Sequence, residues 1–181
     1  EITQLFLYPE TGGGGESPVI PSVTPSGPTT YNVRKDGSGN FRTIQEAINV
    51  MKPGDTIVVG PGRYDERIDL AASNSGTASQ PIIIKALYAA SRTQMTNNVS
   101  MRGWFMSGTK YITLDGFEIT DIGDTAQAGI YMKFSENITI QNSYIHELNT
   151  AVNYYGGIRN SDTGGESHNI KILNNDIYRV E

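Results

Sequence analysis

Tyr111-Ile-Thr-Leu-Asp-Gly-Phe-Glu-Ile119 is the first of three related stretches in the C-terminal half of the chain. The other two are Asn137-Ile-Thr-Ile-Gln-Asn-Ser-Tyr-Ile145 and Asn169-Ile-Lys-Ile-Leu-Asn-Asn-Asp-Ile177, which begin 26 and then 32 residues further on. Each stretch reads as a short alternating strand, a bend at Gly or Asn, and a second short strand. A unit that recurs roughly every 20 to 50 residues predicts a solenoid, in which each unit buries its apolar edge by stacking on its neighbours.

Alternation along these strands assigns their side chains to two faces. Apolar residues at every second position are expected to face inward and form stacked columns: Ile112, Leu114, Ile138, Ile140, Ile170 and Ile172 in the first strands, and Phe117, Ile119, Ile145 and Ile177 in the second. The bends fall at Gly116, Asn142 and Asn174, which are residue types that tolerate a left-handed backbone. Stacked Asn amides at these bends would also hydrogen-bond between coils.

The 181 residues divide into three parts by composition. Residues 1–10 hold the apolar run Leu5-Phe6-Leu7-Tyr8, which predicts a detached strand. Residues 11–30 are rich in Gly, Pro, Ser and Thr and are expected to form a linker. Residues 31–181 are expected to form the solenoid. Within them, residues 43–51 show helical apolar spacing and open with a capping box, Thr43 followed by Glu46.

Composition excludes several classes of protein. The formal net charge is −5 and no basic cluster is present, so we expect no nucleic-acid partner. The absence of Cys excludes a disulfide framework and a thiolate metal site. No stretch approaches the ~20 apolar residues that span a bilayer, so no membrane span is expected. The chain starts at Glu1 rather than Met, as a processed product does, and we expect a secreted, extracellular protein.

The opening of the third part resembles known proteins. Asp36-Gly-Ser-Gly-Asn-Phe-Arg-Thr-Ile-Gln-Glu-Ala-Ile48, Lys52-Pro-Gly-Asp-Thr-Ile-Val-Val59 and Gly76-Thr-Ala-Ser-Gln-Pro-Ile-Ile-Ile-Lys-Ala86 are similar to stretches of the pectate-lyase-like superfamily. The resemblance covers residues 31–181 and implies an all-β fold, a right-handed parallel β-helix, with an N-terminal capping α-helix at 43–51 and about five coils. In active members, catalytic Lys, Arg or Asp residues and calcium-binding acids lie on the outward face of the middle coils.

Outward-facing columns are where a ligand would bind. Two neighbouring columns are expected to combine carboxylates, an imidazole and aromatic rings: Glu118, Tyr144 and Asp176 in one, and Thr120, His146 and Tyr178 in the other. These groups would suit glycan binding, with the rings stacking on pyranose faces. The alternative interpretation is an ordinary solvated sheet face.

Three cations would suit a lyase, which removes a proton next to a uronate carboxylate: Lys133, Arg159 and Lys171. Arg159 follows Tyr131 in the register of a further repeated pair, Gly129-Ile-Tyr-Met132 and Gly157-Ile-Arg159. No calcium loop or second positioned Arg accompanies them, so we assign no catalytic residue, no metal site and no cofactor. A lyase would use Ca²⁺, for which four neighbouring acids carry suitable oxygens: Asp115, Glu118, Asp121 and Asp124.

A solenoid whose last coil lacks a cap exposes apolar side chains and unpaired backbone groups. The last coil is expected to expose Ile170, Ile172 and Ile177. The detached strand could add to such an edge through its apolar residues: Ile2, Leu5, Phe6, Leu7 and Tyr8.

The sequence therefore favours a secreted, non-catalytic structural protein that assembles head-to-tail with copies of itself into an extracellular filament. Two alternatives stay open. One is a lyase of uronate-containing polysaccharide, or a fragment of one, and the other is a carbohydrate-binding module. Either would have an extracellular polysaccharide as its partner.

Overall fold

The computed structural model describes residues 27–87, 93–97, 102–122, 128–148, 156–161 and 167–180. The strand expected in residues 1–10 lies outside the described residues, and so do residues 11–26 of the expected linker. No helix in the described part of the chain is long and apolar enough to cross a membrane.

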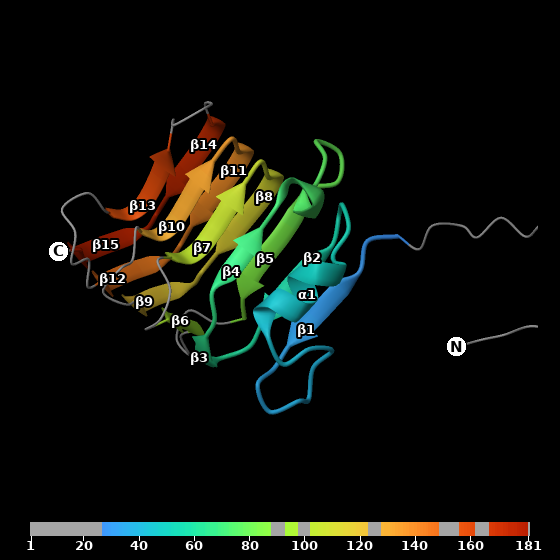
Figure 1. The fold of residues 1–181 in the computed structure, drawn as a ribbon. Helices are drawn as coiled ribbons and strands as arrows, with labels where there is room; N and C mark the ends of the chain where they lie inside the picture. The colour runs from blue at the N-terminus through green and yellow to red at the C-terminus, as the bar shows by residue number, and fades with distance from the viewer. Residues whose placement is uncertain are drawn as a thin grey trace, which may run out of the picture.

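The described strands form three parallel sheets around one core (Figure 1). Sheet A contains β1 (Thr30–Val33), β2 (Thr56–Val59), β5 (Ile82–Ala86), β8 (Lys110–Asp115), β11 (Glu136–Gln141) and β14 (His168–Leu173). Sheet B contains β3 (Gly62–Asp65), β6 (Thr93–Asn97), β9 (Glu118–Ile122), β12 (Tyr144–Leu148) and β15 (Asp176–Val180). Sheet C contains β4 (Ile68–Leu70), β7 (Arg102–Ser107), β10 (Ala128–Lys133) and β13 (Gly156–Ser161).

The chain visits sheets A, B and C in turn, which makes a β-helix. Every pair of neighbouring strands is parallel. Within the described residues, four coils are complete, and β14 and β15 belong to a fifth, as the sequence predicts. Figure 1 looks onto sheet C, with sheet A behind it and sheet B along the lower edge.

The inward column predicted for sheet A is present. Ile112, Ile138 and Ile170 align in neighbouring strands, and so do Leu114, Ile140 and Ile172. The members in β8 and β11 are at most 1% exposed. Burying each such side chain contributes about 1.5–3 kcal/mol to the hydrophobic driving force. Apolar contacts between neighbouring coils therefore stabilise the stack.

The left-handed bends between sheets A and B are confirmed. The φ angles of Gly116, Asn142 and Asn174 are 79°, 54° and 53°. We expected the Asn side chains at the bends to hydrogen-bond each other. Asn142 Nδ2 instead donates to Asp115 Oδ1 at 2.8 Å. A carboxylate is a stronger acceptor than an amide oxygen, which accounts for the choice. An amide-to-amide hydrogen bond joins Asn169 and Asn137 instead, at the starts of β14 and β11.

Helix α1 (Ile44–Val50) covers the N-terminal end of the solenoid, where it packs against β1, β2 and β4 (Figure 1). The predicted capping box is confirmed: the Glu46 N–H donates to Thr43 Oγ1 at 3.3 Å, and the Thr43 N–H donates to Glu46 Oε2 at 3.1 Å. Ile44, Ala47 and Ile48 of the helix face the core and are fully buried. A short 3-10 helix (Ala72–Asn74) follows β4.

The opposite end of the described solenoid exposes its apolar side chains. In β14 and β15, Ile172 is 50% exposed and Ile177 is 44% exposed, while Ile170 is half-buried. These side chains continue the inward columns of the preceding coil, but no further described strand lies over them. Ile172 and Ile177 are thus exposed in the described residues, and their part in assembly stays a prediction.

The backbone at Phe134 is left-handed, a conformation that Asn adopts more readily than Phe. Its φ is 54°, and Gly108, one position after the aligned residue Ser107 of the preceding coil, has a φ of 70°. A left-handed backbone costs an ordinary residue about 1–2 kcal/mol, whereas Asn tolerates it. We expect Phe134→Asn to raise the free energy of unfolding by about 1 kcal/mol in urea denaturation followed by circular dichroism. Thr139→Asn, on the outward face of β11, is the control and is expected to give no gain; a loss of stability in Phe134→Asn would contradict the prediction.

Candidate functional site

Sheet B brings the predicted glycan-binding residues together. Glu118, Tyr144 and Asp176 align across β9, β12 and β15, and His146 aligns with Tyr178. His146 Nε2 lies 2.9 Å from Glu118 Oε1. Glu118 is 4% exposed and His146 is 8% exposed, so these two side chains do not belong to an ordinary solvated face.

Aromatic rings cover the His146 imidazole and account for its burial. The Tyr178 ring stacks on it with a centroid distance of 5.1 Å and an interplanar angle of 7°, and the Tyr144 ring lies 4.5 Å away. The hydroxyl groups of Tyr144 and Tyr178 hydrogen-bond each other. This hydrogen bond raises the pKa of Tyr178 to about 12, so its hydroxyl keeps its proton at neutral pH.

The other imidazole nitrogen faces a second carboxylate. His146 Nδ1 lies 3.5 Å from Glu147 Oε2, and Arg179 donates from Nη1 to Glu147 Oε1 at 3.0 Å. Glu147 and Arg179 are exposed. Among the described residues, His146 Nδ1 has no hydrogen-bond partner. The imidazole is therefore oriented by its contact with Glu118 through Nε2 and by the rings that cover it.

A pocket of 190 Å³ lies beside this cluster, at the corner between sheets A and B. Three of the predicted residues line it, namely Glu118, Tyr144 and Asp176. His146 and Tyr178 do not line the pocket, but they contact Glu118 and Tyr144 and support them.

Sheet C carries a second outward column, made of rings and cations. Asp69, Phe105, Tyr131 and Arg159 align across β4, β7, β10 and β13. The rings of Phe105 and Tyr131 stack with a centroid distance of 5.7 Å and an interplanar angle of 15°. The Arg159 guanidinium lies 5.3 Å from the centre of the Tyr131 ring, and Lys133 Nζ lies 5.6 Å from the centre of the Phe105 ring.

Two of the three predicted cations thus meet on one face. The predicted alignment of Arg159 with Tyr131 is confirmed, and Lys133 lies two residues further along β10. Lys171 aligns with Thr139 on the outward face of sheet A and does not join them.

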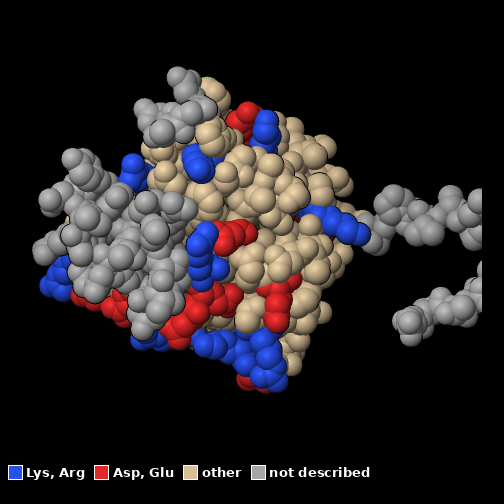
Figure 2. All heavy atoms as spheres, viewed as in Figure 1, with Lys and Arg blue, Asp and Glu red and all other residues tan. Residues whose placement is uncertain are grey.

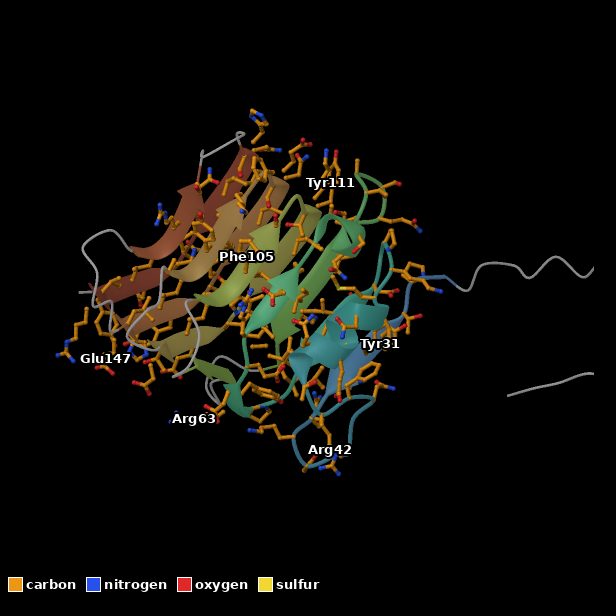
Figure 3. The ribbon with its side chains drawn as sticks, viewed as in Figure 1. Tyr31, Arg42, Arg63, Phe105, Tyr111 and Glu147 are labelled. Carbon is orange, nitrogen blue, oxygen red and sulfur yellow. The ribbon has the colours of Figure 1, made fainter. Side chains whose placement is uncertain are left out.

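Sequence reasoning missed Phe105. A signal for it exists, because Trp104-Phe105-Met106 and Ile130-Tyr131-Met132 share an apolar–aromatic–apolar pattern 26 residues apart. The outer two residues of each triplet are buried in the core. The aromatic residue between them lies on the other face of the strand, where the Phe105 ring is half-buried and the Tyr131 side chain is 8% exposed. Figure 3 labels Phe105 on the face of sheet C, well away from Glu147 of sheet B.

Acidic and basic side chains alternate along the lower edge in Figure 2, on the side where sheet B lies. Two of the ion pairs of sheet B are Arg63 with Asp65 and Arg179 with Glu147. Within the described ranges, no group of three or more His, Asp and Glu side chains is arranged to hold a metal ion. Of the four acids named for Ca²⁺, Asp115 accepts hydrogen bonds from Gln141 and Asn142, and Asp124 lies outside the described residues. Ca²⁺ binding therefore stays a prediction.

Known proteins share this architecture. The model of the chondroitinase B family matches residues 39–118. An Arabidopsis thaliana protein described as a pectinesterase is 44% identical over 46 residues, which are 23% of this chain and 14% of that protein.

Two solved structures superpose on most of the chain. Alginate lyase from Paenibacillus sp. strain FPU-7 has a TM-score of 0.53 and 21% identity, over 66% of this chain and 37% of its own. Pectate lyase Pel9A has a TM-score of 0.51 and 20% identity, over 68% of this chain and 34% of its own. The chain thus spans about a third of the length of these lyases. It has a right-handed parallel β-helix fold, as these lyases do.

Proposed function

We propose that this chain binds uronate-containing polysaccharide along the outward face of sheet C. The observation that carries the proposal is the half-buried Phe105 ring with the cations of Lys133 and Arg159 beside it. The Tyr131 ring, which is 8% exposed, stacks on Phe105 and supports the Arg159 guanidinium. A uronate residue combines a carboxylate with an apolar C–H face. Cations beside aromatic rings match both features, since cations form charge-assisted hydrogen bonds and rings pack on C–H faces.

The similar proteins support this substrate class. Alginate, pectate and chondroitin, which appear in their names, are polysaccharides that contain uronate. Because such polymers lie outside cells, the proposal also includes the secreted, extracellular location expected from the sequence.

The layout of sheet C suits a linear polymer. Parallel strands are spaced at about 4.8 Å, so the column runs along the solenoid axis and presents one outward residue per coil. Phe105, Lys133 and Arg159 are each partly buried, which restricts their side chains before a ligand arrives. Less conformational entropy is then lost on binding.

The test is isothermal titration calorimetry with oligogalacturonate and oligoalginate. We expect Lys133→Ala and Arg159→Ala each to weaken binding about tenfold or more, because each removes a hydrogen bond to a charged group worth about 1.5–3 kcal/mol. Affinity is also expected to fall as salt is raised. Lys171→Ala removes a cation from sheet A and is the matched control, for which no change is expected.

Two outcomes would sink the proposal: no binding of either uronate oligosaccharide, or an equal loss of affinity in Lys171→Ala. The same samples are assayed for unsaturated uronides by their ultraviolet absorbance. Release by the intact chain that disappears in Lys133→Ala would add lyase activity to binding. In that β-elimination the neutral Lys133 amine takes the proton next to the uronate carboxylate, a C=C bond forms, and the glycosidic C–O bond breaks, with the leaving oxygen protonated by water.

We propose head-to-tail assembly into a filament as a second function. The supporting observation is the exposure of Ile172 and Ile177 at one end of the solenoid, while α1 covers the other. The apolar residues 2–8 of a neighbouring copy would cover this end by strand addition. Negative-stain microscopy of the chain and of a version that starts at Thr30 tests this: fibres from the longer form alone support it, and single particles from both would remove it.

A further inference from the structure

The corner between sheets A and B is hollowed along three successive coils. Its pocket of 190 Å³ takes one bend residue and one sheet B residue from each coil: Gly116 with Glu118, Asn142 with Tyr144, and Asn174 with Asp176. The bend residues share a left-handed backbone, with φ between 53° and 79°. The repeat of the bend therefore makes the pocket, which extends along the solenoid axis.

The chemistry of the lining suits a neutral, hydroxyl-rich ligand. The exposed carboxylate of Asp176 accepts hydrogen bonds, and the amides of Asn142 and Asn174 both donate and accept them. The Glu118 carboxylate adds negative charge from behind the wall, where it is buried against His146. Among the described residues that line the pocket, none is Lys or Arg. Sugar hydroxyls would donate to the Asp176 carboxylate, whereas a uronate carboxylate would be repelled by Asp176 and Glu118.

The walls of the pocket are held in place by contacts behind them. Glu118 is 4% exposed and lies 2.9 Å from His146, and the Tyr144 hydroxyl bonds to that of Tyr178. Ser143 Oγ donates to the Gln141 carbonyl at 3.0 Å and accepts from the Phe117 N–H at 3.3 Å. A site fixed in this way loses little entropy when a ligand binds.

We propose that this corner pocket is a second carbohydrate site, which takes a linear neutral polysaccharide lying along the solenoid axis. Successive coils are about 4.8 Å apart. This spacing is comparable to the length of one pyranose residue in an extended chain, so successive coils present polar groups to successive sugars. The Tyr144 ring packs on one pyranose face.

The corner pocket and the column of sheet C are separate sites. The pocket is lined by residues of sheet B and of the bends before it, whereas Phe105, Lys133 and Arg159 belong to sheet C. The column of sheet C presents cations to acidic sugars, whereas the corner presents the Asp176 carboxylate to neutral ones.

The test uses saturation-transfer NMR and calorimetry with three neutral probes, namely xylohexaose, mannohexaose and cellohexaose. At least one is expected to bind saturably. Asp176→Ala is expected to weaken that binding about tenfold, because a charged acceptor of sugar hydroxyls is lost. Asp176 is exposed, so this variant is expected to keep its fold, which circular dichroism checks. Tyr144→Ala is expected to weaken the binding further, and Tyr144→Phe, which keeps the ring, to retain most of it.

Lys171→Ala, which changes an exposed side chain outside both proposed sites, is the matched control and is expected to bind the neutral probe as the parent chain does. The inference is overturned if no neutral hexaose binds at millimolar concentration, or if Asp176→Ala and Tyr144→Ala leave the affinity unchanged. Oligogalacturonate binding, measured on the same samples, reports separately on sheet C, so failure of one site is distinguishable from failure of the other.

Discussion

Replacing Trp104 with alanine is expected to lower the free energy of unfolding by about 4 kcal/mol. Trp104 is fully buried in β7, aligned with Ile68 of β4 and Ile130 of β10. Its ring meets that of Phe117 edge-on, with a centroid distance of 5.1 Å and an interplanar angle of 61°. Truncation leaves a cavity between three coils. Since the stability of a solenoid sums the interfaces between neighbouring units, both interfaces of this coil lose contacts.

Urea denaturation followed by circular dichroism measures the loss. Fluorescence does not serve, because Trp104 is the only Trp of the chain. Trp104→Phe is the matched control, since it keeps most of the ring volume and removes an indole N–H that has no hydrogen-bond partner among the described residues. The control is expected to cost less than about 1.5 kcal/mol. Equal losses in the two variants would contradict the assignment of the effect to packing.

The second large effect is expected at His146. His146→Ala should destabilise the chain by about 3 kcal/mol, because it leaves the Glu118 carboxylate buried without the imidazole that lies 2.9 Å from it. The same change removes the ring that stacks on Tyr178. His146→Gln retains a side-chain N–H donor and is expected to lose less.

A double-mutant cycle separates the two contributions. Glu118→Ala, His146→Ala and the double variant are compared in urea denaturation, and a coupling free energy of at least about 1 kcal/mol is expected from the buried pair. If the two single losses add to within about 0.5 kcal/mol, the pair contributes nothing beyond packing and the prediction is wrong.

The repeat in the sequence was sufficient to predict the solenoid architecture. Alternation in β8 and β11 placed Ile112 and Ile138 on the inward face, and the recurrence of Gly or Asn located the bends, because few residue types accept a left-handed backbone. The capping box at Thr43 located the start of α1 for a similar reason: its hydrogen bonds are local and depend on nearby residues alone.

The candidate sites could be predicted only in part. The register placed Glu118, Tyr144 and Asp176 in one column because equal offsets along the repeat bring residues together. It did not show that Glu118 and His146 are buried. The burial of His146 depends on how the Tyr144 and Tyr178 rings turn over it, and Glu118 lies against His146. Side-chain rotamers are set by neighbouring coils, which the periodicity of one strand does not describe.

The sequence by itself determined the β-helix, the inward columns, the bends and the N-terminal capping helix, because each depends on a local or periodic property of the chain. Only the tertiary structure showed which polar, charged and aromatic side chains come together in a candidate binding site. Phe105, Lys133 and Arg159 come from different coils, and the corner pocket takes its walls from three. Such sites form where coils stack, and the spacing between repeats varies from 26 to 32 residues. Which side chains lie next to each other on neighbouring coils is therefore determined only when the coils pack.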